Sequence, residues 1–190
     1  MYEVEDDRLY CYPGTTVLKN KLDLKDAAEL AAFEAEISSQ RATEPLPEGQ
    51  LDAAHYKAVH RHLFQDVYDW AGDIRKIRIG KSGNWFCFPE HIDRQMEALF
   101  RWLADENYLR GVDAVQFAAK AAHFLAEMNA IHPFREGNGR VQLSFLVLLA
   151  EQAGHPLDME KLEPQKILDA TIESFETDEG LLAEVIAGLL

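Results

Sequence analysis

His132-Pro-Phe-Arg-Glu-Gly-Asn-Gly-Arg140 is a polar stretch between two apolar segments, and it determines how the rest of the chain is interpreted. Residues 112–130 are rich in alanine and carry large apolar residues, whereas residues 141–149 are almost wholly apolar. Helices that are apolar around much of their circumference are typical of the protein interior. We therefore predict two central helices that cross the core and are joined by a polar loop over residues 132–140.

The loop residues suit the binding of a phosphate and a metal ion. Gly137 and Gly139 allow the backbone to approach a ligand closely, and N–H groups at the start of the following helix can bind a phosphate. Arg140 can add a charge-assisted contact. Glu136 offers a carboxylate to Mg²⁺, which completes its coordination with phosphate and water. The sequence thus predicts a local phosphate site.

Two further loop residues complete the chemistry. His132 has the properties of a general base near neutral pH, and Phe134 is expected to point inward. A base, a metal ligand and a phosphate cradle in one loop describe the transfer of a phosphate-bearing group to a hydroxyl. The structural alternative is that Gly-Asn-Gly is a turn, the histidine is packed and the glutamate is solvated. That alternative leaves the clustering unexplained.

Outward from the loop, apolar residues recur at helical spacing over most of the chain. The additional helices that we predict cover residues 23–37, 52–70, 89–103, 166–172 and 181–190. Between residues 76 and 88 the pattern changes to alternation around a turn at residues 80–84, which predicts one β-hairpin. A hairpin that is alone in a helical protein would leave edge strands open to an extended peptide. The alternative is a loop that caps the core.

Composition restricts the partners and the compartment. The 190 residues, 47% of them hydrophobic, can bury one core, so we expect a single domain over residues 1–190. A net charge of −14 argues against nucleic acid as a partner. Only two cysteines are present, which fits the reducing cytoplasm. The most apolar run, residues 143–150, is too short to span a bilayer, so no membrane association is expected.

The loop resembles the Fic signature His-x-Phe-x-Asp/Glu-Gly-Asn-Gly-Arg-x-x-Arg, and residues 12–21, 60–72 and 129–131 resemble other stretches of bacterial Fic proteins. The resemblance covers essentially the whole chain. It implies the Fic fold, which is mainly α, with a helical core around two central helices, a catalytic loop at 132–140 and one β-hairpin flap at about 76–88.

The resemblance also implies roles for individual residues. His132 would deprotonate the target hydroxyl, Glu136 would hold Mg²⁺ between the α- and β-phosphates, and Phe134 would be the structural anchor. The implied nucleotide-binding residues are Gly137, Asn138, Gly139 and Arg140. The family's flap aligns a target segment by strand addition, and the corresponding residues here are Lys76, Ile77, Arg78, Ile79, Gly80 and Lys81.

The implied reaction is attack on the α-phosphate of ATP, which releases pyrophosphate and leaves AMP on a Ser, Thr or Tyr hydroxyl of a protein. Related kinase toxins carry lysine where this chain has Gly139, and this difference favours nucleotidyl transfer. The chain resembles the toxin half of a two-protein module, which implies a small helical antitoxin as a partner. By analogy with similar toxins, the candidate target is a type II DNA topoisomerase.

One position departs from the signature, because Leu143 stands where the family has its second arginine. In the family that arginine helps to hold the terminal phosphate. Its replacement leaves the donor nucleotide open. The alternative function is therefore a catalytically weak or altered-donor Fic domain that acts as a nucleotide- or protein-binding module.

Overall fold

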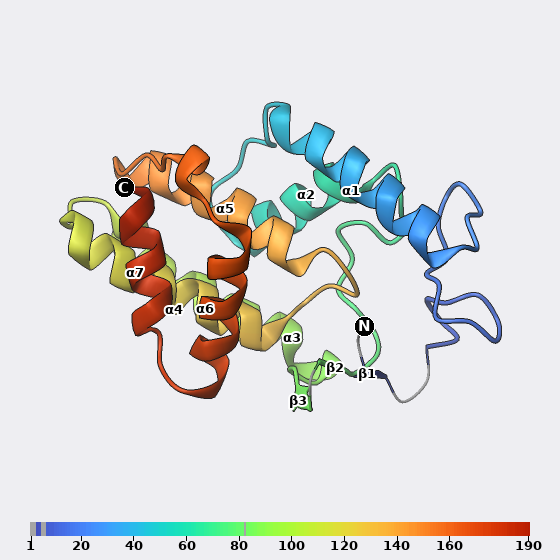
Figure 1. Cartoon of the computed structure of the whole chain (residues 1–190). Helices are drawn as coiled ribbons and strands as arrows, with labels where there is room; N and C mark the ends of the chain where they lie inside the picture. The colour runs from blue at the N-terminus through green and yellow to red at the C-terminus, as the bar shows by residue number, and fades with distance from the viewer. Residues whose placement is uncertain (1–2, 5–6, 82) are drawn as a thin grey trace.

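The computed structural model describes residues 3–4, 7–81 and 83–190, and it is mainly helical, as predicted (Figure 1). Its elements, in chain order, are β1 (Glu3–Val4), α1 (Ala27–Thr43), α2 (Ala53–Phe64), β2 (Ile79–Lys81), β3 (Asn84–Trp85), α3 (Pro89–Asp105), the short η1 (Asn107–Leu109), α4 (Ala114–Ile131), α5 (Asn138–Ala153), the short η2 (Met159–Lys161), α6 (Pro164–Glu176) and α7 (Gly180–Leu189). In this described part of the chain, no helix is long and apolar enough to cross a membrane.

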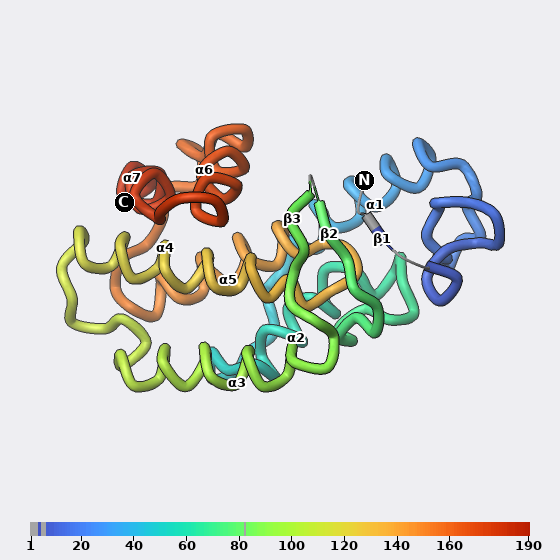
Figure 2. The backbone as a smooth tube through the Cα atoms, turned by 90° about the horizontal axis from the view of Figure 1, so that it is seen from below, coloured from blue at the N-terminus to red at the C-terminus, as the bar shows by residue number. Residues whose placement is uncertain are grey.

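The two predicted central helices are α4 and α5. Asp113 begins α4 by accepting a hydrogen bond from the backbone N–H of Gln116 at 2.8 Å. The helix then packs against α3, α5, α6 and α7, while α5 also packs against α2 (Figure 2). Phe117 and Phe124 on α4 and Phe145 on α5 are completely buried. The core therefore lies around these two helices, and the loop between them emerges at one side of it.

Several helix boundaries differ from the prediction, most of all in the first two helices. The helix predicted over 52–70 ends at Phe64, because Val67 and Tyr68 donate their N–H groups back to the Phe64 carbonyl in tight turns. Their side chains are still buried, so the apolar spacing continues beyond the helix. The first helix begins only at Ala27, after the capping residue Asp26, and extends past the predicted end at residue 37.

The predicted hairpin is present as β2 and β3, with Gly80 opposite Trp85, although Ser82 at its turn lies outside the described residues. The expectation that it stands alone was wrong, although β3 still lies at an edge of the sheet among the described residues. The strand β1 pairs antiparallel with β2, with Val4 opposite Ile79, and the sheet order is β1-β2-β3. Strand β2 thus has a neighbouring strand on both sides, and no local sequence pattern predicted the pairing with β1.

Tyr56 provides a test of the core. Its side chain is completely buried among aromatic rings, and its hydroxyl has no hydrogen-bond partner in the described part of the chain. Because an unpaired buried hydroxyl is destabilising, we expect Tyr56→Phe to raise the free energy of unfolding in urea by about 1 kcal/mol. Tyr68→Phe is the matched control and should lower it, since the Tyr68 hydroxyl donates to Glu34. Equal losses in both variants would contradict this account.

Candidate active site

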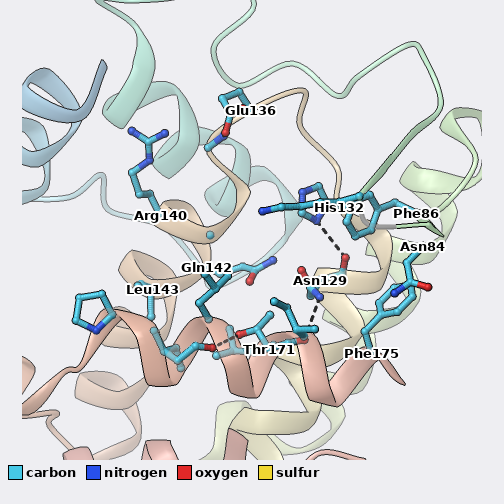
Figure 3. Close-up of a pocket in the computed structure, with 18 of the residues that line it drawn as sticks. Asn84, Phe86, Asn129, His132, Glu136, Arg140, Gln142, Leu143, Thr171 and Phe175 are labelled. Atoms are coloured by element: carbon cyan, nitrogen blue, oxygen red, sulfur yellow. Dashed lines mark hydrogen bonds between the residues drawn. The ribbon is translucent and has the colours of Figure 1, made fainter. Parts of the chain in front are cut away.

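The loop over residues 132–140 lines a cavity of about 470 Å³ (Figure 3). The loop side of the cavity is polar, with His132, Glu136, Gly137, Gly139 and Arg140. The opposite wall is formed by α6 and is mainly apolar, with Pro164, Ile167, Leu168, Ile172 and Phe175. A ligand with a charged end and an apolar end, such as a nucleotide, matches this division.

His132 ends α4 in a left-handed conformation, with φ of 48° and ψ of 64°. Its Nδ1 lies 3.2 Å from the Asn129 carbonyl oxygen. Because a carbonyl only accepts, Nδ1 carries the proton and Nε2 carries the lone pair. The ring stacks on Phe86 at a centroid distance of 3.8 Å, and burial lowers the pKa of His132 to about 3. At neutral pH the imidazole is therefore neutral, and the same burial makes its Nε2 atom a weaker base than a free imidazole.

Glu136 and Gly137 form the centre of the loop. The Glu136 carboxylate accepts the Gly137 N–H at 2.9 Å, while burial and the nearby Glu34 raise the pKa of Glu136. Gly137 has φ of 82°, and a Cβ there would lie 2.4 Å from the Phe64 ring. Both the backbone conformation and this close contact exclude a side chain at position 137.

Helix α5 begins at Asn138, and no side chain among the described residues caps its first N–H groups. A Cβ on Gly139 would meet nothing within 4 Å, and this glycine lines the cavity. Such an uncapped helix start favours an anion. The Asn138 side chain is instead turned into the loop, where it accepts the N–H of Phe134 at 3.0 Å and donates to its carbonyl at 2.8 Å. Binding of nucleotide by Asn138 stays a prediction that concerns its backbone.

Phe134 is completely buried and stacks on His60 at a centroid distance of 3.7 Å. No role for His60 was predicted from the sequence, although His60 lies in the 60–72 stretch that resembles Fic proteins. Its Nδ1 accepts the Gly72 N–H at 2.8 Å, so its Nε2 carries the proton and donates to the Glu136 carbonyl at 3.0 Å. Burial lowers the pKa of His60 to about 3. The neutral His60 thus contacts the loop from the core side, through its stacking on Phe134 and its hydrogen bond to Glu136.

Arg140 lies with its guanidinium on α1 and points away from His132 in Figure 3. It donates to Ser38 Oγ at 2.8 Å and pairs with Glu34, and its guanidinium lies 4.7 Å from the Phe64 ring centroid. No sequence pattern indicated Glu34, which is 106 residues away from Arg140 in the chain. The cation that was predicted to bind phosphate is therefore already held by a carboxylate.

Of the six predicted flap residues, only Lys81 lines the cavity. The Lys76 N–H donates to the Tyr10 hydroxyl, Ile77 accepts through its carbonyl, and Arg78 lies over the Phe88 ring at 4.0 Å. The two remaining flap residues, Ile79 and Gly80, are buried in β2. Two residues that were not singled out as site residues, Asn84 and Phe86, also line the cavity. The flap thus reaches the cavity near its turn and along its returning strand.

Arg75 joins the flap to the loop, and the sequence analysis missed it as well. Its side chain is 1% exposed. Nε donates to the His132 carbonyl at 2.7 Å, Nη1 to the Ile77 carbonyl at 2.7 Å, and Nη2 to the Cys87 carbonyl at 2.6 Å. One guanidinium therefore holds both ends of the hairpin against the loop.

The donor set fits a magnesium ion that arrives with a phosphate. Among the described residues, no group of three His, Cys, Asp or Glu side chains could hold a metal by itself. Glu136, however, presents a carboxylate at the polar side of the cavity, next to the uncapped start of α5. Mg²⁺ commonly takes one or two protein carboxylates and completes its shell with phosphate oxygens and water.

The Arg75 contacts predict a large effect on stability and on the flap. We expect Arg75→Met to lower the free energy of unfolding in urea by at least about 3 kcal/mol, because several buried carbonyls lose a charged donor. Amide hydrogen exchange should become faster over residues 76–88. Arg101→Met, on an exposed position of α3, is the control and should change stability by less than about 0.5 kcal/mol. A flap that keeps its protection in Arg75→Met would refute this role.

His60 predicts a specific dependence of stability on pH. Its folded pKa of about 3 lies below the value of roughly 6.5 expected in the unfolded chain, so the unfolded state takes up the proton first. Stability from this residue is complete above about pH 6.5 and is lost as the pH falls toward 3. Between pH 6 and 4.5 we expect the wild type to lose about 2 kcal/mol more than His60→Gln in urea titrations. Parallel curves for the two proteins would contradict the assignment.

The comparisons with known proteins agree with this geometry. The Fic/DOC family matches residues 50–150. The "Probable protein adenylyltransferase y4lH" of Sinorhizobium fredii is 52% identical over 190 residues, which are 100% of this chain and 98% of that protein. The "Protein adenylyltransferase VbhT" of Bartonella schoenbuchensis is 37% identical over 97% of this chain but only 39% of its own length.

A solved structure is similar over the same extent. The BepC protein of Bartonella tribocorum, a VirB-translocated effector with bound AMPPNP, superimposes with a TM-score of 0.85 at 27% identity, covering 96% of each chain. The family match over residues 50–150 includes α2, the hairpin, the loop and most of α5. Sequence, fold and the placement of the loop therefore lead to one conclusion: this chain belongs to the Fic/DOC family.

Proposed function

We propose that this chain is a protein adenylyltransferase that transfers AMP from ATP to a Ser, Thr or Tyr hydroxyl of a target protein. The observation that carries the proposal is that His132, Glu136 and the uncapped start of α5 meet at one cavity. Relatives that bear the name protein adenylyltransferase support it, as does the similar BepC structure with its bound ATP analogue.

In this proposal His132 takes the proton of the target hydroxyl at its Nε2 atom. The hydroxyl oxygen forms a bond to the α-phosphorus, the bond between the α-phosphorus and the bridging oxygen breaks, and pyrophosphate leaves. The N–H groups at the start of α5, with Gly137 and Gly139, hold the phosphates. Mg²⁺, held by Glu136, would supply positive charge against the phosphate oxygens. Arg140 joins them only by sharing its guanidinium with Glu34.

The flap residues 76–81 are proposed to align the target. Because β1 already pairs with Ile79 and Gly80, a target strand can add to β2 at these positions only by replacing β1. Lys81 is placed to contact the incoming segment, since it is exposed and also lines the cavity. Phe134 acts as the structural anchor that holds the loop in place next to the flap.

The wider setting follows from the same resemblance. We propose that residues 1–190 act as one cytoplasmic Fic domain of the toxin type, with a small helical antitoxin as its partner. The candidate target is a type II DNA topoisomerase. The net charge of −14 supports a protein rather than a nucleic acid as the substrate.

A second candidate function is supported by Leu143, an apolar residue that lines the cavity where the family signature has arginine. With this side chain the cavity offers no guanidinium to the terminal phosphate from that position. A different donor nucleotide, or a catalytically weak module that binds nucleotide or protein, is consistent with this change.

The proposal is tested by incubating the protein with magnesium, each of the four nucleoside triphosphates and a bacterial lysate, and by measuring added nucleotide mass on proteins. We expect an added AMP with ATP, and a loss of more than about 100-fold in rate for His132→Ala because the base is removed. His91→Ala, at an exposed position of α3 that does not line the cavity, should keep full activity. No transfer by the wild type, or equal transfer by His132→Ala, would refute the proposal.

A further inference from the structure

Gln142 has a spare hydrogen-bond donor at the cavity. This residue on α5 is only 5% exposed, and it lines the cavity. Its Nε2 atom is buried and has no hydrogen-bond partner among the residues that the structure describes. Of the buried, unpartnered polar atoms in that part of the chain, it is the one that belongs to a cavity-lining residue. A buried amide without a partner is costly, so its presence at a ligand cavity calls for an explanation.

The neighbouring amides do not share this property. Asn138 uses its carbonyl and its amino group on the backbone of Phe134. Asn129 donates to the Thr171 carbonyl, and Asn84 donates to Glu176. Among the described residues, the Gln142 Nε2 atom has no structural hydrogen bond of this kind.

The position of Gln142 indicates which part of a nucleotide it meets. It lies three residues after Gly139 on the same helix, which is about 4.5 Å further along the axis from the proposed phosphate site. Figure 3 shows its carboxamide between the loop residues His132 and Glu136 and Thr171 of α6. The polar loop is on one side and the apolar wall of α6 on the other. The sugar is the part of a nucleotide that joins a phosphate to a base.

We infer that Gln142 binds a ribose hydroxyl, 2′ or 3′, of the donor nucleotide through its carboxamide and so favours ATP over the analogue that lacks this hydroxyl. A ribose hydroxyl can accept from Nε2 and donate to Oε1, so it can match both groups of the amide. The inference rests on the proposed function, since it assumes that the cavity takes a nucleotide. Gln142 is a specificity residue in this proposal, because its contact distinguishes donors that differ in one hydroxyl.

The test is calorimetry with magnesium and ATP, 2′-deoxy-ATP or 3′-deoxy-ATP, in the absence of a target protein. For the wild type we expect one or both deoxy nucleotides to bind about 5- to 10-fold more weakly than ATP. In Gln142→Met, which has a similar shape and no amide, ATP should bind as weakly as the deoxy nucleotides. Gln116→Met, the same change at an exposed position of α4, should retain the wild-type preference.

Thermal unfolding of the ligand-free proteins separates this role from a structural one. If the amide donor is unpaired without nucleotide, Gln142→Met should melt at the same temperature as the wild type or higher. A lower melting temperature would indicate that Gln142 serves the fold. A wild type that binds all three nucleotides equally, or a Gln142→Met variant that keeps the wild-type preference, would overturn the inference.

With GTP added to the calorimetry, three further outcomes are distinguishable. If Gln142→Met changes the preference between ATP and GTP but not between ATP and its deoxy forms, the contact is to the base, and the assignment to ribose is wrong. If the wild type binds no nucleotide, the proposed function fails together with this inference. If transfer that depends on His132 occurs while Gln142→Met binds and discriminates like the wild type, only the inference about Gln142 fails.

Discussion

The buried guanidinium of Arg75 is the constraint on which the candidate site depends. A charge removed from water must find hydrogen bonds, and Arg75 finds them on the carbonyls of His132, Ile77 and Cys87. These carbonyls belong to the loop and to the two ends of the hairpin, which also meet where Phe86 stacks on His132. The hydrogen bonds of one cation therefore hold His132 and the flap close together. Its backbone N–H adds a further bond to the Pro133 carbonyl at 2.9 Å.

The loop itself is held in an uncommon shape by its surroundings. His132 adopts a left-handed conformation that costs energy for a non-glycine residue, and it persists because both sides of the loop are fastened. Asn138 closes the loop from within, and His60 supports it from the core through the Glu136 carbonyl. Burial keeps His60 and His132 neutral, although only His132 lines the cavity. The two histidines share a charge state but have different surroundings, since His60 is packed in the core and His132 lies at the cavity.

Two opposite electrostatic effects lie close together at the site: the N–H donors at the start of α5 and the negative charge of Glu34. In a chain with a net charge of −14, an anion needs donors that are close to it, and the start of α5 provides them. Glu34 opposes the binding of an anion, because its negative charge is paired with Arg140 and also raises the pKa of Glu136. A nucleotide with its metal would have to compete for these groups. Helix α1 lines no part of the cavity, yet its residue Glu34 interacts with Arg140 and Glu136, which do line it.

The sequence by itself determined what depends on neighbouring residues. The central helices, the hairpin and the loop with its histidine, carboxylate and glycines are all encoded by local periodicity, turn residues and a compact motif, and the structure contains each of them. Only the tertiary structure decided which residues distant in the sequence contact the loop. Arg75 lies 57 residues from His132, His60 lies 76 residues from Glu136, and Glu34 lies 106 residues from Arg140. Strand β1, which closes the edge of β2 that the sequence left open, is equally remote. Contacts of this kind follow from how the helices pack, and helical or strand periodicity reports only which face of an element is buried, not which distant residue it meets.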